Sequence, residues 1–242
     1  MEYRADLHTH TVASGHASNT IDEMVQAAFE KGITLYAITE HSMLMPGTCT
    51  EEYFEQLAEK KSSYKGIDVL YGVELNIIDY NGSVDMGQEL LERMDIGIAS
   101  IHNGIGYTSG NIEENTSAVI GAIKNPYVNI IGHPDDSNIP LDYEKIIHAA
   151  MENDTLLEIN NNSLTDGCWR KDTKKNIGKI LELCKRFGYP VIIDSDAHCS
   201  GNVGRNEEAI CFLRDKSFPD ELVLNYYPER LKNFLNKYKK GI

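Results

Sequence analysis

Histidine and carboxylate side chains recur along this sequence just after short apolar runs. Seven of the eight histidines, together with Glu74 and Asp196, fall at or beyond the ends of such runs. His8 and His10 form a His-x-His pair. Residues two apart in an extended strand point to the same side, so both imidazoles can bind one ion. The full set of candidate metal ligands is His8, His10, His16, His41, Glu74, His102, His133, Asp196 and His198.

The chemical types in this set indicate divalent metal ions. Imidazole and carboxylate groups suit Zn²⁺, Mn²⁺ or Fe²⁺, and no thiolate belongs to the set. A single ion uses three or four ligands, so nine groups indicate two or three ions held close together, with a carboxylate such as Glu74 between two of them. A lone histidine is more often a hydrogen-bonded structural residue, and His148, in the middle of an expected helix, is interpreted in that way.

Seven short segments rich in Val, Ile, Leu and Tyr are expected to be strands of a parallel sheet, because their apolarity is too continuous for a sheet with one face in water. They are Tyr3–Leu7, Thr34–Ile38, Val69–Val73, Ile96–Ser100, Val128–Ile131, Leu156–Ile159 and Val191–Asp194. The carboxyl ends of such strands converge on one face, where distant ligands can meet. The pattern leaves open a closed or distorted barrel and an open doubly wound sheet.

Helical patterns separate these strands. The first carries apolar residues at helical spacing from Ile21 to Phe29, begins at a capping box of Thr20 and Glu23, and stops at Gly32. The other expected helices are Glu51–Tyr64, Gly87–Arg93, Ile112–Lys124, Tyr143–Glu152, Lys174–Phe187, Asn206–Leu213 and Pro228–Lys239. Because no Pro/Gly/Ser-rich linker or break in composition divides the chain, residues 1–242 are expected to form one domain.

The composition disfavours several classes of binding partner and indicates a cellular compartment. The net charge of −14 over 242 residues disfavours long nucleic acid and anionic membranes. The five cysteines are an odd number without a C-x-x-C pair, which is typical of a reducing compartment. The first residues lack the apolar core of a signal peptide, and no apolar run approaches the roughly 20 residues of a membrane span. The expectation is a cytoplasmic protein whose oligomeric state the sequence does not indicate.

The same segments resemble the PHP (polymerase and histidinol phosphatase) family, and most closely its small stand-alone, YcdX-like phosphatases. The resemblance extends over essentially the whole chain. It rests on residues 6–14 (Asp-Leu-His-Thr-His-Thr-Val-Ala-Ser), 72–74 (Gly-Val-Glu), 157–161 (Leu-Glu-Ile-Asn-Asn), 194–198 (Asp-Ser-Asp-Ala-His) and 228–231 (Pro-Glu-Arg-Leu). One departure is Glu40, where many relatives have Asp before the histidine. This departure is expected to alter the surroundings of the ligands and not the ligation itself.

The resemblance implies a distorted (βα)7 TIM-like barrel with a trinuclear metal site at the C-terminal ends of the strands. It implies three divalent ions per chain, Zn, Mn or Fe. By this resemblance one ion takes His8, His10, Glu74 and Asp196, a second shares Glu74 and adds His102 and His133, and the third uses His16, His41 and His198.

The expected activity is hydrolysis of a small phosphate monoester, with a phosphorylated metabolite as partner. Metal coordination lowers the pKa of bound water to about 7 and so supplies hydroxide at neutral pH. Arg205 is a candidate phosphate clamp, and an exposed arginine at a helix start is the alternative. Asp6 and Asp194 lie beside ligands and either orient imidazoles or are solvated or capping residues. The candidate catalytic residues are Glu74, Asp196, His198 and Arg205.

Three other functions share part of the same sequence pattern. A metal-dependent amidohydrolase also opens with His-x-His, but it usually carries a lysine at the fourth strand end, and residues 98–102 (Ile-Ala-Ser-Ile-His) hold none. A phosphodiesterase or exonuclease acting on short nucleotides would use the same ions. A module that only binds metal is disfavoured, because a complete ligand set that still has room for a metal-bound water is typical of a catalytic site.

Overall fold

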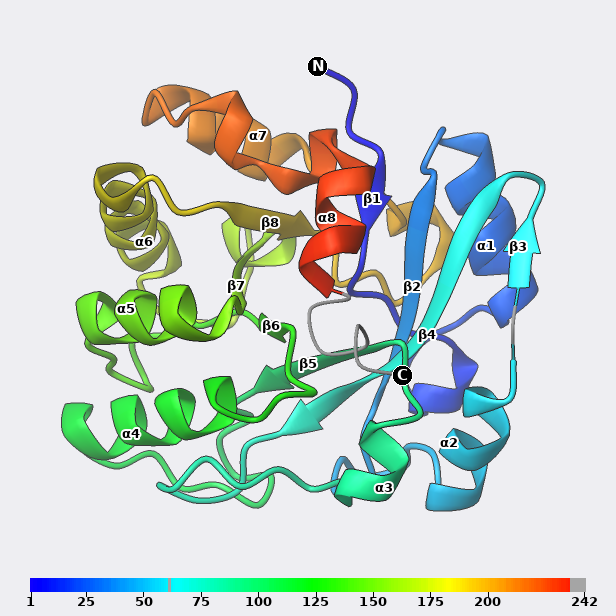
Figure 1. Ribbon diagram of the computed structural model, residues 1–242, viewed down its shortest axis with the longest axis horizontal. Helices are drawn as coiled ribbons and strands as arrows, with labels where there is room; N and C mark the ends of the chain where they lie inside the picture. The colour runs from blue at the N-terminus through cyan, green and yellow to red at the C-terminus, as the bar shows by residue number, and fades with distance from the viewer. Residues whose placement is uncertain (61, 236–242) are drawn as a thin grey trace.

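A parallel sheet forms the centre of the computed structural model, which describes residues 1–60 and 62–235 (Figure 1). Its strands are β1 Ala5–Asp6, β2 Leu35–His41, β3 Ser62–Tyr64, β4 Ile67–Asn76, β5 Ile96–Ser100, β6 Ile130–Ile131, β7 Leu156–Asn160 and β8 Val191–Asp194. All seven expected strands are present; Ile96–Ser100 and Val191–Asp194 have the expected ends, and the ends of the others are shifted. The segment expected at Tyr3–Leu7, for example, is paired only over β1.

The strands follow one another around the sheet in the order β1-β2-β4-β5-β6-β7-β8, and each of these neighbouring pairs is parallel. The two ends of this order meet. Thr9 forms an isolated parallel bridge with Ala197, and the Leu7 amide donates to Asp194 Oδ1 at 2.7 Å. The sheet is therefore nearly closed, and the expected distorted barrel is confirmed.

Helices surround the barrel. They are α1 Ile21–Glu30, α2 Glu51–Ala58, α3 Gln88–Leu91, α4 Ile112–Ile123, α5 Tyr143–Asn153, α6 Thr173–Phe187, α7 Glu207–Asp215 and α8 Pro228–Leu235. Figure 1 shows α4, α5 and α6 along one side of the strands and α1 and α2 along the other. The capping box of Thr20 and Glu23 is formed at the start of α1. Short 3₁₀ turns connect several elements, among them η1 Val12–Ser14 and η2 Asn161–Leu164.

The interior of the barrel changes from apolar to polar along the strands. Period-two alternation places Leu156, Glu158 and Asn160 on one side of β7, and Leu156 belongs to an apolar cluster that also contains Ile98 of β5. Ser100, two residues beyond Ile98 on β5, is polar and buried, as are Glu158 and Asn160 on β7. In α8, Leu231 and Leu235 join the apolar cluster. The barrel is thus filled with aliphatic side chains at one end and leaves its polar groups at the carboxyl ends of the strands.

One predicted helix is wrong in its C-terminal part. The helix predicted over Glu51–Tyr64 ends at Ala58, and β3 pairs antiparallel with the start of β4. Lys65 and Gly66 connect them, both with positive φ (47° and 89°). A two-residue turn with positive φ at both positions matches the twist of a hairpin, and this local geometry overrides the helical pattern.

The last predicted helix, Pro228–Lys239, is present as α8 over its described part, and residues 236–242 lie outside the described residues. None of the helices in the described ranges 1–60 and 62–235 combines the length and the apolarity that crossing a membrane requires.

Candidate metal centre

Glu74, at the carboxyl end of β4, lies at the centre of the candidate site. Its Oε2 is 3.4 Å from His8 Nε2, 3.5 Å from His10 Nε2 and 2.7 Å from His41 Nδ1. The register of the sheet accounts for the last contact, because His41 of β2 pairs directly with Glu74. One carboxylate oxygen is therefore shared by three imidazoles from two different strand ends.

The other oxygen of the same carboxylate faces a second group of imidazoles. Glu74 Oε1 lies 3.4 Å from His102 Nε2 and 3.0 Å from His133 Nε2. The hydroxyl of Ser100 donates to the same oxygen at 2.7 Å. The two oxygens of Glu74 thus face two different sets of nitrogens, as expected of a carboxylate that bridges two ions.

Asp196 and the two remaining histidines complete the cluster. Asp196 Oδ1 lies 3.5 Å from His10 Nε2 and 3.8 Å from His8 Nε2. The Nε2 atoms of His16 and His198 are 3.0 Å apart. All nine candidate ligands are therefore brought together, whereas His148 is exposed on α5 and contacts the ring of Phe187.

The donor atoms fit divalent ions. His8 Nε2, His10 Nε2, His41 Nδ1 and Glu74 Oε2 are buried and have no hydrogen-bond partner in the described part of the chain. The His41–Glu74 contact is short, but it lacks hydrogen-bond geometry. Each unsatisfied buried group costs about 1–3 kcal/mol. Two ligands held 2.0–2.1 Å from one Zn²⁺ lie about 3.0–3.4 Å apart, which is close to the distances observed here.

Three groups of side chains have donor atoms within 4.8 Å of one another and could each hold an ion. They are His8, His10 and Glu74; His41, Glu74 and His102; and His10, His41 and His198. The first contains three of the four ligands expected for one ion. The other two groups combine His41 with Glu74 or with His10, whereas the expected sets combine it with His16 and His198. The assignment of individual ligands to individual ions stays a prediction.

Hydrogen bonds at the outer ring nitrogens leave the inner nitrogens free. His8 Nδ1 lies 2.7 Å from Glu158 Oε1, and a carboxylate can only accept there. His102 Nδ1 lies 2.7 Å from Asn76 Oδ1, and the Asn76 amide nitrogen donates to Asp85 at 2.7 Å. Both imidazoles therefore carry a proton on Nδ1, which leaves Nε2, the atom that faces Glu74, as the candidate ligand atom.

Ser14 and Glu40 fix His10 in the same way. The Ser14 hydroxyl donates to Glu40 Oε2 at 2.5 Å, so it can only accept from His10 Nδ1 at 3.1 Å. Glu40 also accepts from the Thr11 amide at 3.0 Å. The expectation that Glu40 acts around the ligands agrees with these contacts, which are all indirect with respect to His10.

The substitution Ser14→Ala is expected to lower metal affinity by about 10–100-fold while the chain stays folded, because His10 loses the acceptor that orients its ring. Competition with a chromogenic chelator measures this affinity. Ser18→Ala, at an exposed position nearby, is the matched control. An affinity equal to that of the control would show that Ser14 does not position His10.

Backbone strain is concentrated at two of the candidate ligands. His133 and Asp196 adopt positive φ values of 27° and 52°, a region that costs a residue other than glycine about 1–3 kcal/mol. Gly132 precedes His133, and a Cβ at Gly132 would lie 2.2 Å from Ser100 Oγ. The chain bends sharply at these strand ends, which brings both side chains into the cluster.

Neighbouring charges and burial shift the pKa values of the side chains in the cluster. Burial alone would raise the pKa of Glu74, but the neighbouring imidazoles of His8, His41 and His102 hold it well below its usual value. Burial and the proximity of His41 and His198 lower the pKa of His10 well below its ordinary value. A neutral imidazole and an ionised carboxylate are the forms that bind metal.

Asp6 and Asp194 do not orient imidazoles through any hydrogen bond found among the described residues. Asp6 accepts from the Ser195 amide at 3.0 Å and the Gly204 amide at 2.7 Å, and Asp194 accepts from Leu7. These carboxylates join β1 to β8 where regular ladder bonds are missing, so that interpretation is corrected. Burial raises the pKa of both groups.

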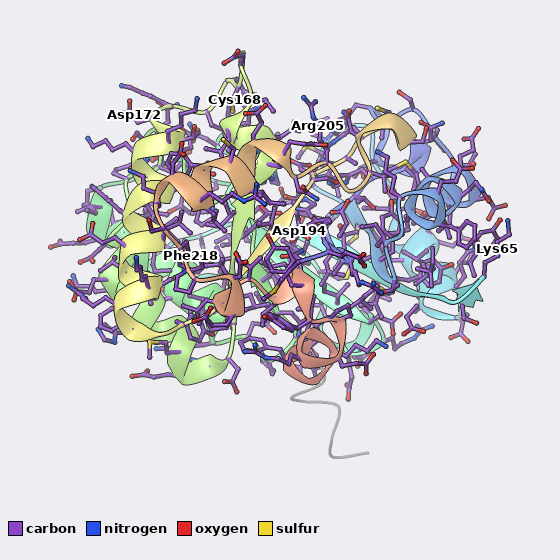
Figure 2. The ribbon with its side chains drawn as sticks, turned by 90° about the horizontal axis from the view of Figure 1, so that it is seen from above. Lys65, Cys168, Asp172, Asp194, Arg205 and Phe218 are labelled. Atoms are coloured by element: carbon purple, nitrogen blue, oxygen red, sulfur yellow. The ribbon has the colours of Figure 1, made fainter. Side chains whose placement is uncertain are left out.

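A pocket of about 440 Å³ lies over the cluster. The segment 162–170 forms one wall, and Figure 2 shows its Cys168 on a loop at the upper edge of the view. Arg170 lines this pocket with a side chain only 7% exposed; it donates to Ser163 Oγ at 2.9 Å and lies 3.4 Å from Asp196 Oδ2. The described lining does not include Arg205, whose side chain is 46% exposed beside Glu207.

Glu158, Arg170 and Asp135 are charged residues near the cluster that are not among the predicted site residues. Glu158 and Asp135 are fully buried carboxylates, and burial raises the pKa of Asp135 to about 6 although the charge of Arg170 opposes this shift. A charged residue within the apolar run of β7 was a signal for Glu158. Arg170 lies in a loop without periodicity, where only the three-dimensional arrangement shows its role.

Comparison with known proteins decides the family. A family model described as "PHP domain" matches residues 6–162. The chain belongs to the PHP family.

Curated relatives align with all or nearly all of the chain. A "probable phosphatase" of Thermoanaerobacter sp. (strain X514) is 40% identical over 242 residues, which is 100% of this chain and 98% of the relative. Another, from Caldanaerobacter subterraneus subsp. tengcongensis, is 43% identical over 237 residues, 98% of this chain and 92% of the relative. The chain is thus grouped with the phosphatases of the PHP family.

A solved structure shares the fold. The histidinol phosphate phosphatase of Lactococcus lactis, crystallised with zinc, L-histidinol and phosphate, superimposes with a TM-score of 0.62 at 18% identity and covers 90% of this chain and 95% of its own. The range of the PHP family model includes Glu74 and Glu158, whereas Arg170, Asp196 and His198 follow it in the sequence.

Proposed function

We propose that this protein is a metal-dependent phosphatase that hydrolyses a small phosphate monoester. The observation that carries the proposal is the position of Glu74, whose two oxygens face five imidazoles within 3.5 Å. The curated names of the relatives and the zinc and phosphate bound to the structural neighbour support it.

Three divalent ions held by the nine ligands, Zn, Mn or Fe, belong to this proposal. Divalent ions, when bound, neutralise phosphate oxygens and lower the pKa of the water that they hold. The ligands are His8, His10, His16, His41, Glu74, His102, His133, Asp196 and His198. We also propose that residues 1–242 form one PHP domain, since β8, beyond the matched range, pairs with β7.

The residues of the chain itself bind and orient the ester. Arg170 offers a guanidinium that is always charged, and its contacts with Ser163 and Asp196 hold it against the cluster. A planar, immobilised guanidinium binds two phosphate oxygens at once. Glu158 and Ser14 keep the rings of His8 and His10 in place, so that little reorganisation is needed when substrate binds.

The proposed partner is a small phosphorylated metabolite in the cytoplasm. The pocket of about 440 Å³ falls within the range of small-molecule sites, and the net charge of −14 disfavours a polyanion. The odd number of cysteines and the lack of a C-x-x-C pair favour a reducing environment.

Hydrolysis of p-nitrophenyl phosphate and of bis(p-nitrophenyl) phosphate, each with added Mn²⁺ or Zn²⁺, tests the proposal. We expect kcat/KM for the monoester to exceed that for the diester by at least about tenfold, because Arg170 and the ions favour the dianion, and we expect a chelator to abolish the activity. Activity confined to the diester would assign the protein to the phosphodiesterases of short nucleotides instead.

A further inference from the structure

Trp169 is the single tryptophan of the chain, and it lies in the wall of the metal pocket with 72% of its surface exposed. A tryptophan ring offers a large apolar surface that folded proteins usually cover. Aromatic side chains commonly line the pockets that bind small molecules, and an uncovered ring in such a lining is available to contact a ligand.

The loop that carries Trp169 is anchored on both sides. The Lys171 amide donates to Asp136 Oδ1 at 3.0 Å, and the Ser137 amide donates to the Lys171 carbonyl at 2.9 Å. On the other side, the hydroxyl of Thr173, at the start of α6, donates to the Ser163 carbonyl at 2.6 Å. The ring is thus presented from a fixed backbone.

The guanidinium of Arg170 supports the ring. Its central carbon lies 5.3 Å from the centre of the Trp169 ring, within the range of a cation–π contact. Arg170 itself is held at the metal cluster by Asp196. The position of the ring is therefore coupled to that of the group we propose to bind phosphate.

The pocket has two chemically different walls. The metal cluster and Arg170 form the wall suited to a phosphate dianion. On the remaining lining, Met45, Cys168 and Trp169 supply polarisable and apolar surface beside the polar residues Asn162, Thr165 and Asp166. A phosphate ester bound at the first wall has only its alcohol part available for the second.

We infer, on the basis of the proposed phosphatase function, that Trp169 determines specificity by stacking on a planar ring in the alcohol part of the substrate. The preferred substrates are then phosphate monoesters that carry an aromatic or heteroaromatic ring. Aromatic pairs contribute about 0.5–1.5 kcal/mol, which corresponds to about twofold to tenfold in binding or in kcat/KM.

Binding to the metal-loaded protein tests this inference directly, because all tryptophan fluorescence comes from Trp169. Benzylphosphonate and propylphosphonate, which differ in the ring, are titrated separately. We expect a saturable change in emission, with benzylphosphonate binding about threefold to tenfold more tightly. Emission that stays unchanged by benzylphosphonate, or equal dissociation constants, would overturn the inference.

Hydrolysis by variants supplies the second measurement and separates the two proposals. Trp169→Leu should lower the ratio of kcat/KM for benzyl phosphate to that for propyl phosphate about threefold to tenfold, whereas Trp169→Phe should retain most of the preference. Equal losses on both esters would also overturn the inference, while leaving the phosphatase function intact. If the wild type hydrolyses neither ester, the proposed function fails, and the phosphonate titration still decides the role of Trp169.

Discussion

Glu74→Gln is expected to lose bound metal and phosphatase activity together, with kcat/KM falling at least about 10³-fold. Both oxygens of Glu74 face imidazole nitrogens, three on one side and two on the other. An amide is neutral and places an NH₂ group where one of the carboxylate oxygens was. It cannot bridge two cations, and its donor faces nitrogen lone pairs or ions.

Elemental analysis of the purified variant and its hydrolysis of p-nitrophenyl phosphate measure the two effects. Glu152→Gln, an exposed residue of α5, makes the same chemical change away from the site and is the matched control. Circular dichroism of both variants verifies folding. A Glu74→Gln protein with full metal content and full activity would exclude the bridging role.

Arg170→Met is expected to lower kcat/KM for phosphate monoesters by about 10²-fold with metal content retained. Among the described lining residues of the loop wall, Arg170 carries the positive charge, and its side chain is only 7% exposed. Methionine preserves much of the apolar length and removes the charge. The inhibition constant of inorganic phosphate should rise with the loss of activity, because binding of the dianion is impaired.

Arg205→Met is the matched comparison for this experiment, since Arg205 is the candidate clamp of the sequence analysis, with an exposed arginine at a helix start as its alternative. Its side chain is 46% exposed, and its Nε lies 4.0 Å from Glu207. We expect kcat/KM of this variant to stay within about twofold of the wild type, as for most surface substitutions. The reverse outcome, a large loss at Arg205 and none at Arg170, would restore Arg205 as the phosphate clamp.

The sequence pattern predicted a parallel sheet and the set of side chains that meet at its strand ends because both depend on regular features, whereas the barrel was implied only by the resemblance to the PHP family. Strands such as Ile96–Ser100 are apolar runs that a parallel sheet buries. The rule that strand ends converge then brings His102 and His133 to Glu74 without further information.

The supporting interactions could not be predicted in the same way, because they depend on tertiary distances. Ser14 is an ordinary small polar residue in the sequence, and only its contacts with Glu40 and His10 give it a role. The hairpin at Lys65 and Gly66 depends on two positive φ values, which the helical pattern of the preceding residues concealed.

Anomalous diffraction from a crystal soaked in Mn²⁺ or Zn²⁺ tests the central claim most directly. The account predicts anomalous peaks beside Glu74, with ions about 2.0–2.3 Å from His8 Nε2, His10 Nε2 and the Glu74 oxygens. Ions bound elsewhere, or these side chains turned away from one another with no ion between them, would contradict it.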